Sequence, residues 1–228
     1  MGIPEVSIVI PTYNEEKRIL KTLNALVPFL TRNHVDYEII ISDGGSTDGT
    51  IAIIPKFERL KIIRSPVFLA KGEALISGGL RACGRKILFL DADLPVSKND
   101  ILRLFKNTKN NTMVVASRYH PLSGGRCPLT RLVLGRLFNL LVRIILRIKM
   151  YDTQCGAKCL SVKLAKRILG KIENKGYVFD IELIIRVLRE GGIVREIPVT
   201  WRHEAGSKVK IPKVAFELLI GVLKLRRM

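Results

Sequence analysis

Two carboxylates one residue apart, Asp91 and Asp93, directly follow the apolar run at residues 87–90, which predicts a buried strand. Neighbouring carboxylates at a strand end repel each other unless a cation lies between them. Hard divalent ions such as Mg²⁺ and Mn²⁺ take oxygen ligands and often bridge to the phosphates of a substrate. The Asp-Ala-Asp sequence therefore predicts an Mg²⁺ or Mn²⁺ site held by Asp91 and Asp93.

Two other predicted strands also end in polar segments. Residues 6–10 lead into Pro-Thr-Tyr-Asn-Glu at 11–15, and residues 38–41 lead into Ser-Asp-Gly-Gly-Ser at 42–46. In open parallel sheets the ligand crevice lies beyond the carboxyl ends of the strands. A purely structural alternative remains for each segment, because Asn14 or Asp48 can cap a helix and Asp43 with its glycines can form a turn.

Two common phosphate-binding motifs are absent from the sequence around this crevice. The chain lacks the Gly-x-x-x-x-Gly-Lys-Ser/Thr loop of nucleoside-triphosphate hydrolases, and no Gly-x-Gly-x-x-Gly follows the first strand as in dinucleotide-dependent dehydrogenases. The remaining interpretation is a ligand whose diphosphate is held through a metal ion, with nearby carboxylates for base or sugar hydroxyls. The predicted bound group is therefore a nucleotide-sugar.

An α/β fold with a mainly parallel sheet must position these residues, since short β-branched runs alternate with helical patterns over the first 120 residues. The predicted strands are residues 6–10, 38–41, 61–64, 87–90 and 113–116. The predicted helices or helical turns are residues 15–30, 48–55, 72–83 and 99–107. We expect one domain over 1–228, with a nucleotide-sugar and metal half at 1–120 and an acceptor and membrane-facing half at 121–228.

The net charge of +19 implies an anionic partner, and 23 of the 39 Lys and Arg residues lie after residue 110. Nucleic acid, an acidic membrane face and a phosphorylated substrate all fit such a charge. A nucleic-acid-binding module is the weaker interpretation, because only 6% of the residues are aromatic and the charge leaves the paired aspartates unexplained. No nucleic acid is expected as a partner.

Two amphipathic basic segments, residues 131–149 and 211–228, favour attachment to an anionic membrane surface. Arg136, Arg143 and Arg147 fall on one face of the first, and no apolar run is long enough to span a bilayer. Both segments could instead be ordinary helices packed on a core. The chain shows no signal peptide and no paired cysteine spacing, which predicts a cytoplasmic protein, peripheral on the cytoplasmic face of the membrane.

Several blocks of sequence resemble the family 2 glycosyltransferases with the GT-A fold. The first set is SIVIPTYNEEKRI at 7–19, SDGGSTDGT at 42–50, AKGEALISGGLRACGRKILFLDADLP at 70–95 and ASR at 116–118. Three later blocks resemble the branch that glucosylates or mannosylates dolichyl and related polyprenyl phosphates: YDTQCGAKCL at 151–160, GYVFDIELI at 176–184 and VTWRHEAGSKVK at 199–210. The resemblance implies an inverting hexosyl transfer from a nucleotide-sugar.

The resemblance also implies roles for individual residues. The base and ribose pocket would be lined by Pro11, Tyr13, Glu15 and Asp43, and the metal and donor diphosphate would be held by Asp91 and Asp93 with the Ala92 backbone alongside. Donor or acceptor phosphates would contact Arg118, Arg202, Ser207 and Lys208, with Arg131 assisting. Asp180 and Glu182 could bind sugar hydroxyls, or act as a base if the acceptor were a hydroxyl. The catalytic candidates are Asp93, Asp180 and Arg202. For any single Arg the alternative is a solvated surface charge.

One departure from the resemblance favours glucose over mannose as the sugar, together with DTQCG at 152–156, FDIEL at 179–183 and the W-x-x-x-x-G-S-K pattern at 201–208. Mannosyl members commonly place a metal-binding Gln two residues after the Asp-x-Asp, where this chain has Pro95, which has no side-chain ligand. A second departure is that many relatives carry two acidic residues where this chain has Asp43-Gly44.

The expected acceptor, a lipid monophosphate, is already largely dianionic at neutral pH and needs no base. The alternatives are transfer to a glycan hydroxyl, or a basic nucleic-acid- or membrane-binding module without catalysis.

Overall fold

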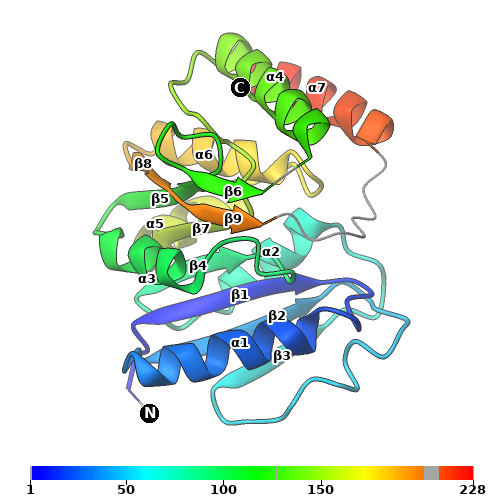
Figure 1. Cartoon of the computed structure of the whole chain (residues 1–228), viewed down its shortest axis with the longest axis vertical. Coiled ribbons are helices and arrows are strands. Elements are labelled where there is room, and N and C mark those ends of the chain that lie inside the picture. The colour runs from blue at the N-terminus through cyan, green and yellow to red at the C-terminus, as the bar shows by residue number, and fades with distance from the viewer. Residues whose placement is uncertain (1, 127, 203–210, 228) are drawn as a thin grey trace.

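The computed structural model describes residues 2–126, 128–202 and 211–227, and the side chains of Arg126, Arg131 and residues 211–216 are left out of the description. Its centre is a seven-stranded sheet covered by helices (Figure 1). The strands of this sheet are β1 Val6–Thr12, β2 Tyr37–Asp43, β3 Leu60–Arg64, β4 Lys86–Leu90, β5 Thr112–Ser117, β7 Ala157–Ser161 and β8 Ile193–Pro198. They lie in the order β3-β2-β1-β4-β7-β5-β8.

The first four strands are parallel, as the sequence predicts. β1 pairs with both β2 and β4, and β2 pairs with β3. Every residue of β2 is buried, and β1 and β4 are buried over nearly their whole length, which explains their almost continuous apolar runs. The strand order reverses between β1 and β4, so the crevice expected at such a switch point lies beyond Thr12 and Leu90.

The remaining strands were not predicted, apart from β5. β7 runs antiparallel between β4 and β5, and β8 pairs in parallel with β5 at the sheet edge. Two short strands, β6 Gly124–Arg126 and β9 Thr200–Arg202, form a separate two-stranded ribbon. Within this ribbon β9 lies against the segment after β4, because Arg202 N donates to Pro95 O at 3.1 Å.

Helices cover both faces of the large sheet. Helices α1 Ile19–Arg32 and α3 Lys98–Asn107 pack on one face through side chains such as Leu23 and Phe105. Helices α2 Lys71–Leu80, α5 Val162–Ile168 and α6 Phe179–Arg189, with the short 3₁₀ turn Leu169–Lys171, pack on the other. Alternate strand residues supply the two cores: Ile8 and Ile10 face one, and Val9 faces the other.

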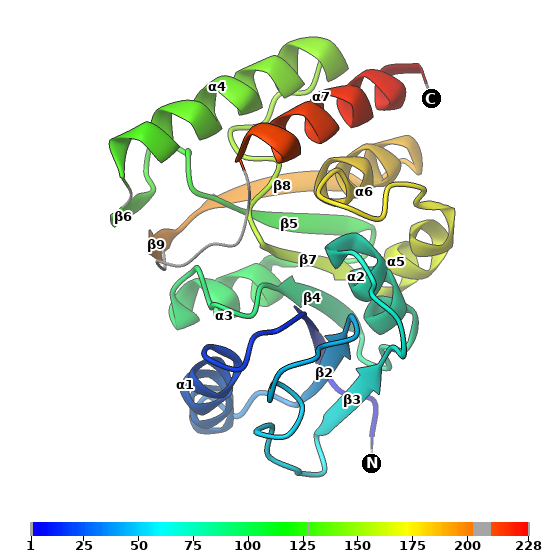
Figure 2. The ribbon, with the colours of Figure 1, turned by 90° about the vertical axis from the view of Figure 1, so that its right-hand side faces the viewer.

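Helices α4 Leu129–Leu146 and α7 Ile211–Arg227 form an outer layer over α6 (Figure 2). Val142 of α4 packs there with Ile181 of α6 and Val222 of α7. Both predicted amphipathic segments are therefore helical, although α4 ends before the left-handed Arg147 (φ 55°). In the described ranges we find no helix with the length and apolarity to cross a membrane.

One predicted helix begins later than expected, for a local reason. The helix expected from residue 15 begins at Ile19, because Asn14 adopts a left-handed conformation (φ 56°) and Arg18 N closes a turn onto Glu15 O at 2.9 Å. Residues 48–55 form turns, the second form that the sequence allowed. Asp48 Oδ1 there accepts from Thr50 N at 3.0 Å, a local bond that competes with helix formation.

Candidate active site

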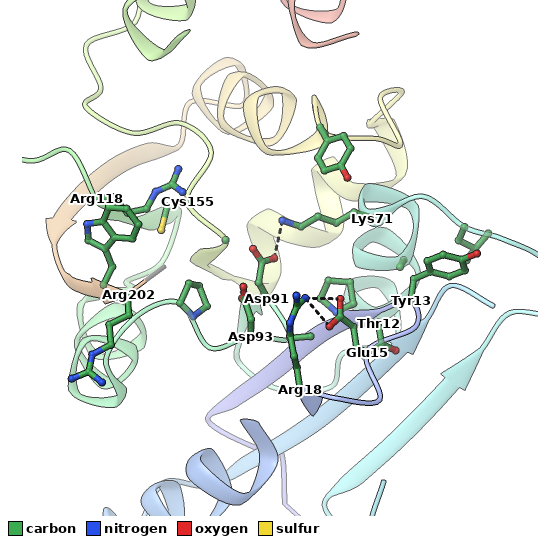
Figure 3. A pocket seen from close by; sticks show the side chains of 18 of the residues that line it. Thr12, Tyr13, Glu15, Arg18, Lys71, Asp91, Asp93, Arg118, Cys155 and Arg202 are labelled. Atoms are coloured by element: carbon green, nitrogen blue, oxygen red, sulfur yellow. Dashed lines mark hydrogen bonds and ion pairs between the residues drawn. The ribbon is translucent and has the colours of Figure 1, made fainter. Parts of the chain in front are cut away.

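A cleft of about 450 Å³ opens beyond the carboxyl ends of β1 and β4 (Figure 3). It combines a carboxylate pair, several cations and an aromatic rim. Its lining residues are Pro11, Thr12, Tyr13, Glu15, Arg18, Phe68, Leu69, Lys71, Ala74, Asp91, Ala92, Asp93, Pro95, Arg118, Cys155, Gly156, Tyr177, Trp201 and Arg202. The structure thus brings together eight of the predicted positions: Pro11, Tyr13, Glu15, Asp91, Ala92, Asp93, Arg118 and Arg202.

Asp91 and Asp93 both face this cleft but differ in their partners. Asp91 Oδ1 lies 2.7 Å from Lys71 Nζ, whereas the buried Oδ1 of Asp93 has no hydrogen-bond partner among the described residues. Burial, and next the neighbouring Asp91 carboxylate, raises the pKa of the Asp93 carboxyl from 3.8 to about 6. A bound cation would offset the cost of burying this carboxylate charge without a partner.

These two carboxylates fit a hard divalent cation that arrives with a diphosphate. Among the described residues no cluster of three or more His, Cys, Asp or Glu side chains is placed to hold a metal ion. A site with two protein carboxylates leaves its other positions for phosphate oxygens and water, which is the usual arrangement for Mg²⁺ at substrate phosphates. Pro95 lines the same cleft and adds no ligand.

Lys71, at the first position of α2, was not singled out from the sequence. Its Nζ contacts Asp91 Oδ1 at 2.7 Å and lies 3.8 Å from Asp180 Oδ2. Burial disfavours its charged form, but the Asp91 and Asp180 carboxylates outweigh burial and raise the pKa of Lys71 above its ordinary value. Lys71 therefore remains a cation at the floor of the cleft, beside the predicted metal ligands (Figure 3).

Gly156 provides the close backbone approach that Asp91 needs. Asp91 N donates to Gly156 O at 3.2 Å, and a Cβ at position 156 would overlap the Asp91 Oδ2 oxygen. The absence of a side chain at 156 is thus a requirement of the carboxylate's position.

Arg118 lies at the opposite wall, just after β5. Its Nε and Nη2 donate to the two oxygens of Asp152 at 2.7 and 3.0 Å, and its guanidinium lies over the rings of Tyr119 and Trp201 at 5.2 and 5.8 Å. Burial opposes the charge, but Asp152 outweighs it and raises the pKa of Arg118 further. The same pairing lowers the pKa of the Asp152 carboxyl against its burial. Arg118 is thus a fixed cation with an aromatic backing.

The rim near β1 has the chemistry of a nucleobase site. The rings of Tyr13 and Phe68 meet edge to face, with centroids 4.9 Å apart, and both are exposed. Glu15 Oε2 accepts from Arg18 Nη1 at 3.1 Å (Figure 3). Aromatic faces suit a planar base, and a carboxylate suits ribose hydroxyls. Phe68 lies in a loop without regular pattern, so nothing in the sequence marked it.

Asp43, predicted for the base pocket, is not among the described residues that line the cleft. It is buried, and its Oδ1 accepts from Thr12 Oγ1 at 3.0 Å. Its Oδ2 accepts from the backbone N–H groups of Gly45 and Ser46 at 3.1 and 2.9 Å. Asp43 therefore shapes the loop after β2, the turn role that its sequence also allowed.

Asp180 and Glu182 also lie outside the lining. Asp180 Oδ1 lies 2.7 Å from Lys158 Nζ, which is itself buried and donates to Cys155 O. Glu182 is buried, accepts from Arg186 Nε at 2.6 Å and from two backbone N–H groups, and these bonds lower its pKa against the opposing burial. Glu182 thus supports the loop before α6, whereas Asp180 Oδ2 lies 3.8 Å from Nζ of the cleft residue Lys71.

The residues predicted to contact phosphates lie partly in the cleft and partly outside the described structure. Arg202 lines the cleft, but its exposed side chain extends away from the two aspartates (Figure 3). Ser207 and Lys208 lie outside the described residues, and Arg131 falls on α4 with its side chain not described.

Comparisons with known proteins place this cleft in a family. The Glycosyl transferase family 2 model matches residues 7–169. The chain is 30% identical to a dolichyl-phosphate beta-glucosyltransferase of Trichomonas vaginalis, over 94% of this chain and 72% of that protein. It is also 30% identical to the dolichyl-phosphate beta-glucosyltransferase of Saccharomyces cerevisiae, over 94% of this chain and 73% of that protein.

Solved structures give the fold. The mannosyl-3-phosphoglycerate synthase of Rubrobacter xylanophilus matches with a TM-score of 0.75 at 18% identity, covering 98% of this chain and 74% of that one. The glucosyl-3-phosphoglycerate synthase of Mycobacterium tuberculosis, in complex with Mn²⁺ and UDP-glucose, matches with a TM-score of 0.72 at 22% identity, covering 98% and 79%. These matches confirm the expected GT-A architecture. By its family match and its relatives, the chain belongs to glycosyl transferase family 2 and is a glycosyltransferase.

Proposed function

We propose that this protein transfers glucose from a nucleotide-sugar to dolichyl or a related polyprenyl phosphate, with Mg²⁺ or Mn²⁺, at a membrane surface. The observation that carries the proposal is the cleft in which Asp93 lies beside Asp91, its Oδ1 without a hydrogen-bond partner in the part of the chain that the structure describes, with Lys71 and Arg118 as fixed cations. Support comes from relatives named dolichyl-phosphate beta-glucosyltransferases and from a structural neighbour crystallised with Mn²⁺ and UDP-glucose.

The cleft residues divide the work of binding the donor. Tyr13 and Phe68 receive the base, Glu15 the ribose, and Asp91 and Asp93 hold the metal ion. The bound ion supplies positive charge that offsets the negative charge developing on the leaving nucleoside diphosphate. Lys71 places a second positive charge beside Asp91 and keeps that carboxylate oriented.

A phosphate acceptor needs no general base, which agrees with a described cleft wall where Glu15 and Asp91 are paired with cations and Asp93 is assigned to the metal ion. A phosphate monoester is largely a dianion at neutral pH and can attack the anomeric carbon directly, with inversion. Asp180 is paired with the buried Lys158 and lies 3.8 Å from Lys71, so both of its oxygens face cations. Arg118 would help to bring the two anionic reactants together, with Arg202, Ser207, Lys208 and Arg131 as further candidates for phosphate contacts.

The outer layer supports action at a membrane. Seven apolar side chains of α4 are exposed and form what we call the α4 ridge: Leu129, Val133, Leu134, Leu137, Leu140, Leu141 and Ile144. Arg136 and Arg143 flank this ridge. An apolar stripe with flanking cations suits an interfacial helix on anionic lipid, so we place the enzyme on the cytoplasmic face as a peripheral protein.

Lipid-phase transfer tests the proposal. Vesicles containing polyprenyl phosphate are incubated with the protein, Mn²⁺ and either labelled UDP-glucose or labelled GDP-mannose. We expect label from UDP-glucose in the lipid extract, none with EDTA, and far less from GDP-mannose, because the relatives compared above are named dolichyl-phosphate beta-glucosyltransferases. Transfer from neither donor would refute the proposal, and preferential transfer from GDP-mannose would refute the glucose assignment.

Asp180→Asn separates a phosphate acceptor from a glycan hydroxyl. A hydroxyl acceptor needs a general base, whose loss costs about a hundredfold to ten-thousandfold in rate. With a phosphate acceptor, we expect Asp180→Asn to keep measurable turnover, reduced through the loss of its ion pairs with Lys158 and Lys71. Thermal unfolding of the variant provides the folding control. A folded variant whose turnover falls more than about a thousandfold would favour the hydroxyl acceptor.

A further inference from the structure

We propose that Asn139 of α4 is a positioning residue that holds the 150–156 segment, and through it Arg118 and Asp91, in place. This inference uses the proposed function only to choose the substrates of one assay. The 150–156 segment connects the end of α4 to β7, and it passes along the cleft at Cys155 and Gly156.

Asn139 is bound to this segment through its whole side-chain amide. Its Nδ2 donates to Met150 O at 3.0 Å and to Tyr151 O at 2.7 Å. Its Oδ1 accepts from Thr153 N at 3.1 Å and from Thr153 Oγ1 at 3.0 Å. Both N–H bonds and both lone pairs of the amide are used, in a side chain that is only 5% exposed. Replacing the amide would leave buried backbone groups without partners.

The 150–156 segment in turn contacts two charged residues of the cleft, Arg118 and Asp91. Asp152 accepts three hydrogen bonds from Arg118, from its backbone N and from two guanidinium nitrogens. Gly156 O accepts from Asp91 N, and the missing side chain at 156 leaves room for the Asp91 carboxylate. A displacement of the segment would therefore move the fixed cation and one predicted metal ligand together.

The opposite side of the segment is fixed to the sheet. Glu196 of β8 accepts from Tyr151 N at 2.7 Å and from Asp152 N at 2.8 Å, and Lys158 of β7 donates to Cys155 O. Asn139 supplies the anchor from α4, with a weaker contact where the Arg143 guanidinium lies over the Tyr151 ring at 5.9 Å. Asn139 thus ties the cleft to the helix that carries the α4 ridge.

Thiol labelling with peptide mapping tests this role without any substrate. Cys155 is buried in the segment, and burial raises its pKa to about 11, so it should react slowly in the wild type. The exposed Cys83 is an internal positive control, and Cys159, buried in β7, reports global unfolding. We expect Asn139→Ala to increase the labelling rate of Cys155 at least tenfold relative to that of Cys159.

Val142→Ala is the matched control on the same helix. Val142 is fully buried between α4, α6 and α7 and does not contact the segment through hydrogen bonds, so its truncation loosens helix packing alone. We expect no selective gain at Cys155 in this variant. An unchanged Cys155 rate in Asn139→Ala, or an equal selective gain in Val142→Ala, would overturn the proposal. If Asn139→Ala does not fold, the isosteric Asn139→Asp, which loses both donated bonds, takes its place under the same criteria.

The catalytic arm measures glucose transfer in the same variants. We expect kcat of Asn139→Ala to fall about tenfold to a hundredfold, because small displacements of positioned groups carry losses of that size, and Val142→Ala to stay within about threefold. Selective Cys155 labelling with an unchanged kcat would refute the positioning role. A wild type without glucose transfer would refute the proposed function instead, and the labelling result would still decide whether Asn139 holds the segment.

Discussion

Asp93→Asn should make the protein more stable at pH 8 while it removes metal-dependent activity. The Asp93 carboxyl is largely buried, its Oδ1 lacks a hydrogen-bond partner among the described residues, and Asp91 lies beside it. Ionisation of this group is therefore unfavourable in the folded state. Asparagine has nearly the same shape and carries no charge, so the substitution removes the cost and keeps the packing.

The size of the effect follows from the pKa. Burial, then the Asp91 carboxylate, raises the pKa of Asp93 from 3.8 to about 6, so the folded state binds this proton more tightly than the unfolded chain does. The free energy of unfolding therefore falls as the pH rises, beginning near pH 4, and the full loss is reached above pH 6. At pH 8 the cost is about 3 kcal/mol. Its removal should raise Tm by about 6–12 °C in a domain of this size.

Thermal unfolding in EDTA at pH 8 and at pH 4 measures this difference. We expect Asp93→Asn to melt above the wild type at pH 8 and the gap to shrink at pH 4, where the wild-type carboxyl is protonated. Asp91→Asn is the matched control and should destabilise, because Lys71 loses its 2.7 Å ion pair. The reasoning is refuted if Asp93→Asn melts at or below the wild type at pH 8.

Three further substitutions test the cleft and the α4 ridge. Gly156→Ala should weaken Mn²⁺ binding with UDP at least about tenfold in calorimetric titration, because the new Cβ displaces the Asp91 carboxylate; unchanged affinity would contradict the assigned packing. Arg118→Lys keeps the charge but loses the two-point pairing with Asp152, so kcat should fall about tenfold or more at saturating donor. Leu137→Glu, at a side chain 58% exposed, should reduce co-sedimentation with anionic vesicles severalfold and leave Tm unchanged; undiminished sedimentation would argue against the α4 ridge.

The parallel half of the sheet was predictable because burial on both faces leaves a plain signal. β1, β2 and β4 are nearly continuous apolar runs, and each ends in the polar residues that mark the crevice. β7 gave no such signal, since its second residue is Lys158, whose ammonium group is buried in an ion pair with Asp180 and a hydrogen bond to Cys155 O. β8 is an edge strand that carries Arg195 and Glu196, and its partly exposed residues do not form an apolar run.

The site was predictable where chemistry follows from position in the chain. Asp91 and Asp93 follow a buried strand at one residue's spacing, and the structure confirms that they face one cleft. Asp43 and Glu182 occur in equally suggestive contexts, but a carboxylate that accepts from loop N–H groups looks the same in a sequence as one that faces a ligand. Lys71 reaches Asp91 only through the packing of α2 on the sheet, which no local pattern encodes.

Two charged pairs of the cleft, Lys71–Asp91 and Arg118–Asp152, contrast with the Asp93 carboxylate, whose Oδ1 has no hydrogen-bond partner among the described residues. Lys71 neutralises Asp91, and Asp152 neutralises Arg118, so these groups are held in one orientation before any substrate binds. The Oδ1 of Asp93 keeps its charge without such a partner within the described structure, and the folded state is less stable for it. A divalent cation bound by Asp91 and Asp93, as proposed, would offset this charge, and the stability lost at Asp93 would then contribute to the affinity for the ion. If the ion binds there, a proton competes for the Asp93 carboxylate below about pH 6, and we expect the apparent metal affinity to fall up to about tenfold per pH unit, in the range where the free protein gains stability.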